Sequence, residues 1–238
     1  MSAFEGKSVL VLGGSSGIGQ AVAGAAAERG AHVTIASRTE ARLDAALKVL
    51  PQGVAAAQIN LREDTDVERF FGDDRLWDHI VISGAETPMG SVRELPLADA
   101  YAAMDSKFWG AYRAARAAKF AEKASLTLVS GFLSQRPRPG IGLQCAINAA
   151  VESLGRALAL ELAPVRVNTV SPGLIATPLW DDMGQDAREG MYARAAGRLP
   201  VGRVGQTEDV ASLILELASN GFASGSTVFL EGGSLVAA

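Results

Sequence analysis

Short runs of β-branched and other apolar residues alternate along the chain with longer Ala-rich segments, in which apolar residues recur at helical spacing. The first such unit predicts a strand over residues 8–12, a helix over 17–29 and a strand over 33–36. A strand, a helix and a second strand in this order are typical of the βαβ unit of a parallel sheet.

The alternation continues to the end of the chain and predicts the remaining elements. Further strands are expected over residues 54–59, 79–82, 126–130, 165–170 and 227–230, and further helices over 42–50, 65–71, 97–123, 143–163 and 208–218. The apolar runs of the seven strands are typical of a sheet buried on both faces. The sequence therefore predicts an α/β fold of the doubly wound Rossmann type, with a seven-stranded, mostly parallel sheet and helices on both faces.

Composition narrows the kind of partner. The chain has 238 residues, 48% of them hydrophobic and 20% charged, with a formal net charge of -4. This length fits one dinucleotide-binding domain over residues 1–238. The acidic balance gives no electrostatic footprint for nucleic acid or an anionic membrane. We expect a small-molecule substrate instead.

Targeting and metal signals are absent from the sequence. No apolar run approaches the roughly 18 residues that span a bilayer, and residues 1–7 lack the apolar region of a signal peptide. We therefore expect the protein to be located in the cytoplasm. Cys145 is the lone cysteine, and His32 and His79 lie far apart, so neither a disulfide framework nor a metal site is predicted.

A glycine-rich loop follows the first strand and opens the first helix. Glycines let the backbone turn tightly and approach a pyrophosphate, while the helix N-terminus offers N–H donors and partial positive charge. Ser15 and Ser16 add hydroxyl donors. The loop is predicted to bind a dinucleotide through Gly13, Ser15, Ser16, Gly17, Ile18 and Gly19.

The end of the second strand indicates which dinucleotide is bound. An acid there would accept hydrogen bonds from the 2'-hydroxyl of the adenosine ribose, but the chain has Ser37 and Arg38. A serine hydroxyl can donate to a 2'-phosphate and a guanidinium can pair with it. These residues favour NADP(H) over NAD(H).

The spacing of Gly13, Gly17 and Gly19 resembles that of the short-chain dehydrogenase/reductase family, and other blocks agree in order and spacing. Ser83, Gly84 and Ala85 resemble its Asn-Asn-Ala-Gly motif. The segments Arg166-Val167-Asn168, Pro172-Gly173 with Thr177, and Glu231-Gly232-Gly233 resemble three further motifs of the family. The chain is thus similar to this family from residue 6 to residue 233.

The resemblance implies roles for these residues. Ser83, Gly84 and Ala85 would pass under the adenosine ribose, and Asn60 and Leu61 would flank the adenine. The nicotinamide end would be held by the segment that includes Pro172, Gly173, Ile175 and Thr177. The family also implies a homodimer or homotetramer built on the helices over residues 97–123 and 143–163.

The positions that do proton chemistry in this family are altered. Aligning residues 149–162 puts Gln144 at the position of the family's tyrosine and Asn148 at that of its lysine. The family's serine falls at Gly131, next to Ser130, and its asparagine falls at Lys107. A carboxamide has no usable proton equilibrium near neutrality, so Gln144 cannot replace the phenol as an acid.

Three interpretations follow. The chain is a reductase whose substrate needs no strong acid, such as a C=N bond or an activated C=C bond, or the acid has moved elsewhere, or the chain binds NADP(H) as a pseudoenzyme with a regulatory or assembly role. The second interpretation has Arg136 as an electrostatic clamp and takes its acid from Lys107, Asp181, Asp182 or Tyr192.

Lys107 and Asn148 suggest an exchange of charge, because one family position changes from asparagine to lysine and another from lysine to asparagine. The Lys107 ammonium would then fill the space that the family's lysine leaves empty where Asn148 replaces it, and would bind the nicotinamide ribose. A lysine on the helix surface is the alternative. Gln144 and Asn148 could likewise fill the old pocket by bonding to each other. Residues 178–199 correspond to the family's substrate-covering segment and suit a lid.

Overall fold

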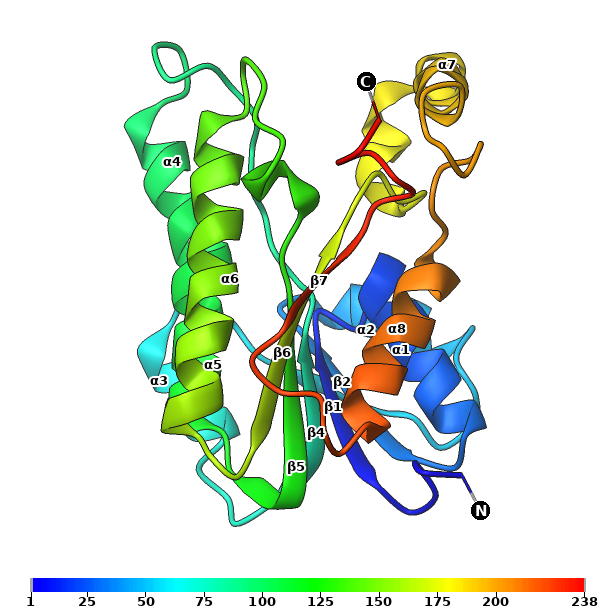
Figure 1. The fold of residues 1–238 in the computed structure, drawn as a ribbon. Helices are drawn as coiled ribbons and strands as arrows, with labels where there is room; N and C mark the ends of the chain where they lie inside the picture. The colour runs from blue at the N-terminus through cyan, green and yellow to red at the C-terminus, as the bar shows by residue number, and fades with distance from the viewer. Residues whose placement is uncertain (1, 238) are drawn as a thin grey trace.

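Seven strands form one sheet in the computed structural model, which describes residues 2–237 (Figure 1). The strand order is β3-β2-β1-β4-β5-β6-β7, and every neighbouring pair is parallel. The strands are β1 (Ser8–Leu12), β2 (His32–Ser37), β3 (Ala55–Gln58), β4 (Trp77–Ile82), β5 (Phe120–Val129), β6 (Arg166–Pro172) and β7 (Thr227–Leu230). The predicted doubly wound fold is confirmed.

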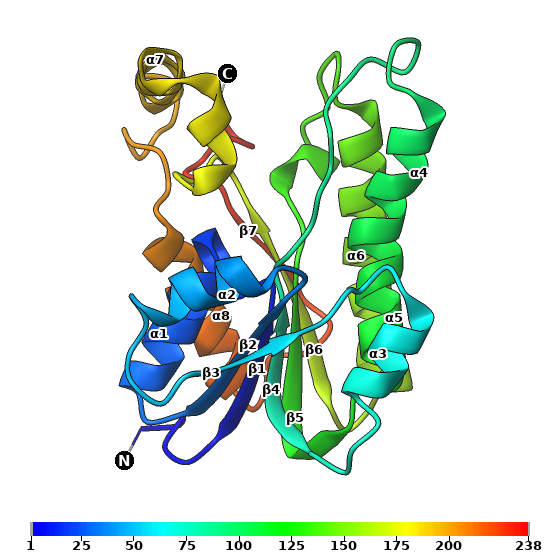
Figure 2. The same ribbon diagram turned by 180° about the vertical axis from the view of Figure 1, so that it is seen from behind.

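Helices cover both faces of the sheet, as the two opposite views show (Figures 1 and 2). One face carries α1 (Gly17–Glu28), α2 (Glu40–Leu47) and α8 (Thr207–Ser219), and the other carries α3 (Asp64–Phe70), α4 (Leu97–Met104), α5 (Gly110–Ala117) and α6 (Gly142–Glu161). A single π-helical segment, η1 (Asp105–Trp109), joins α4 to α5. Short 3-10 turns η2 (Phe132–Ser134) and η3 (Pro178–Met183), with α7 (Gln185–Ala196), complete the described elements.

The strand β1 shows why its apolar run does not alternate with polar residues. Its residues Val9 to Leu12 are fully buried. Side chains along a strand point to opposite faces in turn, so Val9 and Val11 pack into the core beneath α1 and α8, while Leu10 and Leu12 pack into the core on the other side. Both faces of the strand therefore need apolar residues.

The prediction of one helix over residues 97–123 is wrong at its C-terminal end. The helix stops at Ala117, and β5 already begins at Phe120. Phe120 pairs with Trp77 of β4 and packs against the core, and a shift in register follows, where Lys123 has a positive φ of 64°. Pairing with β4 thus outweighs the helical propensity of this Ala-rich stretch.

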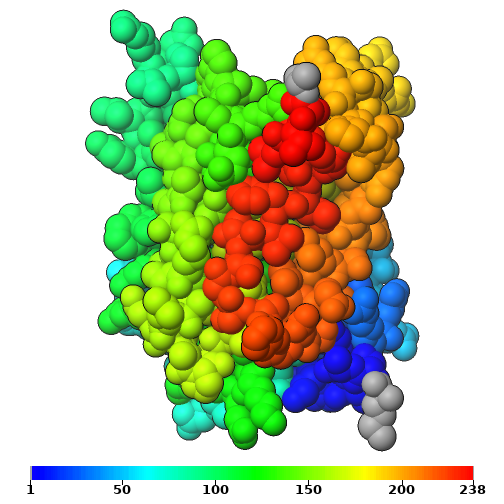
Figure 3. Space-filling model, viewed as in Figure 1, coloured from blue at the N-terminus to red at the C-terminus, as the bar shows by residue number. Residues whose placement is uncertain are grey.

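The chain ends on the side of the molecule where the strands have their carboxyl ends. After β7, residues 231–237 run between the surfaces of α6 and of the α7 and α8 region, as the space-filling view shows in red (Figure 3). A side-chain carbon at Gly173, after β6, would stand 2.8 Å from the Cα atom of Glu231. No helix within residues 2–237 combines the length and apolar character needed to cross a membrane.

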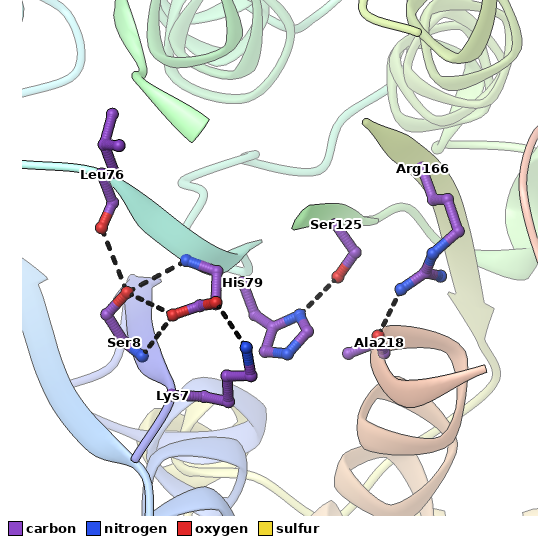
Figure 4. Close-up of polar contacts among 8 residues, drawn as sticks. Lys7, Ser8, Leu76, His79, Ser125, Arg166 and Ala218 are labelled. Carbon is purple, nitrogen blue, oxygen red and sulfur yellow. Dashed lines mark hydrogen bonds and ion pairs between the residues drawn. The ribbon is translucent and has the colours of Figure 1, made fainter. Parts of the chain in front are cut away.

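A polar network closes the opposite end of the sheet (Figure 4). His79 of β4 is 6% exposed, and its Nδ1 atom lies 2.9 Å from the Ser125 hydroxyl of β5. Burial lowers the pKa of His79 to about 4; Asp78 opposes this shift, while Arg166 and Lys7 add to it. His79 is therefore neutral at physiological pH.

We predict that His79 makes the fold sensitive to mild acid. Its folded pKa of about 4 lies below the ordinary value of 6.5, so the stability it contributes is present above pH 6.5 and is lost as the pH falls toward 4. Between pH 7 and pH 4, the free energy of unfolding should fall by about 3 kcal/mol more in the wild type than in His79→Asn. Urea unfolding at both pH values measures this difference; equal losses in the two proteins would contradict it.

Candidate active site

A pocket opens at the carboxyl ends of β1, β2 and β4, where the order of strands in the sheet reverses. In open α/β sheets this is the place where ligands bind. The pocket brings together nine residues that the sequence predicted for the cofactor. They are Gly13, Ser15, Ser16, Ser37, Arg38, Asn60, Leu61, Gly84 and Ala85.

Glycine is needed in the loop between β1 and α1 for two different physical reasons. Gly13 has a positive φ of 84°, and a side-chain carbon on it would stand 2.2 Å from the amide nitrogen of Gly84. A side-chain carbon on Gly19 would stand 2.2 Å from the Gly13 carbonyl oxygen. Gly17 also has a positive φ, of 55°, but its nearest neighbour would be the Thr177 methyl at 3.5 Å. The first two therefore permit close backbone packing, whereas Gly17 permits a turn beneath Thr177.

Unused polar groups in this pocket fit a phosphorylated dinucleotide. Ser16 precedes α1 in extended conformation without capping the helix with its side chain, so the first N–H groups of α1 remain free for an anion. The hydroxyl of Ser37 is buried in the pocket wall and has no hydrogen-bond partner among the described residues. A buried hydroxyl without a partner is costly, and a ligand oxygen would satisfy it.

Arg38 lies at the rim of the pocket and forms an ion pair with Glu86. Arg62 also reaches Glu86, at 3.3 Å, and Arg42 lines the same rim. The Arg38 guanidinium holds the pKa of the Glu86 carboxyl below its usual range. Three guanidinium groups against one carboxylate leave the rim net positive, as a 2'-phosphate requires.

Sequence reasoning missed Glu86, Arg42 and Arg62. The signal for Glu86 was its place directly after Ser83-Gly84-Ala85, where the four-residue family motif would end in glycine. Asn60 was expected beside the adenine, and it does line the pocket, but its side chain accepts a hydrogen bond from the Arg62 N–H at 3.2 Å. Asn60 therefore also shapes the local turn.

Lys107 and Asn148 lie in direct contact. The Lys107 ammonium, in η1, donates to the Asn148 side-chain oxygen at 2.7 Å and to the Ser130 carbonyl at 2.9 Å. Burial lowers the pKa of Lys107 to about 8, and the charge of Glu152 partly opposes this shift. Lys107 is thus a partly buried cation directed at the end of β5 rather than a lysine on the helix surface.

Gly131 leaves room for the Asn148 amide. A side-chain carbon at Gly131 would stand 2.8 Å from the Asn148 nitrogen. The φ angle of Gly131 is 174°, an extended conformation that any residue adopts. The lack of a side chain at this position is therefore a matter of space and not of backbone strain.

Gln144 holds a loop in place and does not bond to Asn148. Its amide nitrogen donates to the carbonyl of Pro88 and, at 3.3 Å, to that of Thr87. Both are backbone acceptors, so the amide nitrogen is directed at this loop. Its oxygen is buried without a hydrogen-bond partner among residues 2–237. Gln144 thus points its amide nitrogen at the loop and not at Asn148.

The other predicted acids lie apart from this contact. Asp181 pairs with Arg188, and Tyr192 lies in α7, partly exposed. Arg136 follows η2, and its guanidinium makes no ion pair or hydrogen bond with residues 2–237. Trp180 of the predicted lid segment donates to the Ile175 carbonyl at 2.9 Å, which ties η3 to the segment that follows β6. Among the described residues, no group of three His, Cys, Asp or Glu could hold a metal ion.

Comparison with known proteins places almost the whole chain in one family. A family model described as enoyl-(acyl carrier protein) reductase matches residues 13–234. The curated protein "Short-chain dehydrogenase/reductase ucsE" of Acremonium sp is 31% identical over 98% of this chain and 97% of its own length.

Solved structures agree in fold over nearly the full length. The MalC Reductase/Diels-Alderase of Malbranchea aurantiaca has a TM-score of 0.89 at 27% identity, covering 99% of this chain and 98% of its own. A small-chain dehydrogenase in complex with NADPH has a TM-score of 0.82 at 32% identity, covering 98% and 100%. An NADPH-bound short chain oxidoreductase of Pseudomonas aeruginosa PAO1, described as containing an atypical catalytic center, has a TM-score of 0.87 at 27% identity, covering 95% and 96%.

We predict that a methyl group at position 131 costs stability through Asn148. Gly131→Ala should lower the free energy of unfolding by about 1–3 kcal/mol, as overpacking a buried contact does. The same substitution in an Asn148→Ala background should cost much less, because the crowding atom is gone. Chemical denaturation of the four proteins of this double-mutant cycle measures the coupling, and a cost that is unchanged in the second background would refute this explanation.

Proposed function

The chain belongs to the short-chain dehydrogenase/reductase family of oxidoreductases, and on that premise we propose that it is a reductase of C=N or activated C=C bonds that acts as one domain over residues 1–238. The observation that carries this proposal is the arrangement around Asn148. A lysine occupies the site, while Gln144, at the family's tyrosine position by resemblance, directs its amide nitrogen at two backbone carbonyls.

The cofactor is NADP(H), as Ser37 and Arg38 predict, and two similar structures hold NADPH. We propose that the pyrophosphate lies on the free N–H groups at the start of α1 and that the 2'-phosphate lies between Ser37 and the positive rim. Toward the nicotinamide end, the proposed contacts are Asn148 and the segment after β6. We propose that the other residues assigned to the cofactor in the sequence analysis, of which Gly13 is the first and Thr177 the last along the chain, also contact it.

When bound, this cofactor supplies a hydride, so the chain's own residues must manage the charge that develops on the substrate. A ketone would become an alkoxide, which needs a proton or strong hydrogen-bond donors. Gln144 supplies neither. An iminium carbon, in contrast, becomes a neutral amine, and an activated C=C bond spreads its charge over the activating group. These substrates fit the site better than a simple ketone.

Lys107 is the residue we propose to provide positive charge at the site. Its ammonium is fixed by the Asn148 oxygen and the Ser130 carbonyl, and a pKa of about 8 leaves it mostly protonated at pH 7. Such a group is able to bind ribose hydroxyls and to release a proton near neutrality. Asp181 is less suited, because it is already paired with Arg188.

We also propose a homodimer or homotetramer built on the surface of α5 and α6. Large side chains are exposed on these helices and beside them: Leu160 is 81% exposed, Trp109 46% and Tyr112 42%. Trp109 and Tyr112 also stack edge to face at 5.7 Å. Exposed aromatic and aliphatic residues of this kind are typical of subunit interfaces.

We predict that Arg38 sets the preference for the phosphorylated cofactor. Arg38→Ala should weaken NADPH binding by about tenfold to a hundredfold, the effect of losing one charge-assisted contact of about 1.5–3 kcal/mol. NADH binding should change little, because NADH lacks the 2'-phosphate. Fluorescence titration with both cofactors measures the two dissociation constants.

The matched control is Arg29→Ala, which removes an exposed guanidinium at the far end of α1. It has the same charge change and should leave both dissociation constants unchanged. An equal loss of NADPH affinity in the two variants, or an equal loss of both cofactors in Arg38→Ala, would contradict the proposed role of Arg38.

We predict a preference for imines and enones over ketones of the same carbon skeleton. The rate of NADPH consumption, measured by its absorbance at neutral pH, should be at least about a hundredfold higher for the cyclic imine or the enone than for the ketone. A general acid contributes about that much to ketone reduction. NADPH binding is measured in parallel by fluorescence. Efficient ketone reduction would refute the proposed chemistry, and binding without consumption of any substrate would instead favour a pseudoenzyme.

A further inference from the structure

A buried carboxylate stands behind the proposed site, where sequence reasoning assigned no function. Glu152 of α6 is 3% exposed. One of its oxygens, Oε1, accepts hydrogen bonds from the hydroxyls of Ser130 at 2.8 Å, Ser134 at 2.6 Å and Ser171 at 3.0 Å. The three serines come from the end of β5, from η2 and from β6. The fold thus gathers three separate elements around one carboxylate.

Glu152 belongs to the same stripe of α6 as the proposed site residues. Gln144, Asn148 and Glu152 follow one another at intervals of four, so they lie on one face of the helix, and all three are buried. A carboxylate removed from water is costly unless it is hydrogen-bonded and its charge is balanced. The three hydroxyls supply the hydrogen bonds but no positive charge.

Ser130 links the carboxylate to Lys107. Its hydroxyl donates to Glu152, while its backbone carbonyl accepts from the Lys107 ammonium at 2.9 Å. The Ser130 hydroxyl also lies 3.1 Å from the Asn148 carbonyl, and the Asn148 side chain is the other acceptor for Lys107. Ser130 therefore contacts both charged groups, the cation through its backbone carbonyl and the carboxylate through its hydroxyl.

The remaining charged groups around Lys107 are engaged elsewhere or exposed. On its own segment, Asp105 pairs with Arg113 at 2.8 Å, and Arg113 also pairs with Asp64 of α3. Asp99 of α4 is exposed. Glu152 is the charged group whose field acts to raise the pKa of Lys107 against the effect of burial.

We propose that Glu152 is a positioning residue that keeps Lys107 protonated and directed at Asn148, through the network centred on Ser130. This inference rests on the proposed function only for the role of Lys107 as the positive charge at the active site. Without the negative charge of Glu152, burial alone would set the shift in the pKa of the Lys107 amine, and Lys107 would lose its proton at a lower pH. The charge at the site would then be lost within the physiological range.

The test is a direct titration of Lys107 in the protein without cofactor or substrate. The chain has five lysines, so NMR of protein labelled with ¹³C at the lysine Cε position resolves few signals, and Lys107→Met identifies the one that belongs to Lys107. In the wild type this signal should titrate near pH 8. In Glu152→Gln, which keeps the size and the acceptor oxygen, the midpoint should fall by about one pH unit.

Ser134→Ala is the matched control, because it removes one hydroxyl from the carboxylate but keeps its charge, and it should move the midpoint far less. Glu152→Asp keeps the charge and serves as a second variant if Glu152→Gln does not fold. In Glu152→Asp, the Lys107 midpoint should lie closer to the wild-type value than to the value expected without a charge at position 152. An unchanged midpoint in folded Glu152→Gln would overturn the proposal. So would a wild-type midpoint at the ordinary value of a lysine.

These outcomes are separate from those of the substrate panel. A failed titration would leave the reductase activity and the role of Arg38 untouched. If no substrate is reduced while the Lys107 midpoint still depends on Glu152, the network stands and the proposed reaction is wrong.

Discussion

The loop after β1 and the loop after β4 touch backbone to backbone, because a side-chain carbon on Gly13 would lie 2.2 Å from the amide nitrogen of Gly84. The two strands are neighbours in the sheet, and the chain leaves them for opposite faces. The pocket opens where the chain segments after β1 and β4 diverge, and the close contact of Gly13 with Gly84 forms part of its lining. Both glycines line the pocket, together with Ser16 at the start of α1 and Arg38 at the rim.

The same contact couples the cofactor pocket to the proposed reaction site through one short loop. From Gly84 the chain passes Glu86, which pairs with Arg38 and Arg62 at the adenosine end. The next carbonyls, of Thr87 and Pro88, accept hydrogen bonds from the Gln144 amide nitrogen at the other end. Gln144 thus holds the loop that also carries Glu86 at the positive rim. The cofactor pocket and the proposed reaction site therefore share this loop.

The sequence predicted the sheet and the glycine-rich turn between β1 and α1 well because both depend on local patterns. Apolar runs and the spacing of Gly13 and Gly17 can be seen without any tertiary contact. The end of the helix before Phe120 was wrong because pairing with β4 decides it. Glu86 and Glu152 were missed for the same reason, since their partners lie far away in sequence. Only the interval of four from Asn148 to Glu152 hinted that the polar stripe continues.

Gly131, Asn148 and Lys107 fit one another in space and charge, which supports the function that we propose. Gly131 leaves the space that the Asn148 amide needs, and Asn148 accepts the Lys107 ammonium. Burial depresses the pKa of Lys107, so holding a cation there costs stability, and an apolar side chain would fill that space without the cost. Glu152 is a second buried charge with the same disadvantage. Two opposed charges kept at such a cost beside a cofactor pocket are expected where chemistry needs them and not where a site is only filled.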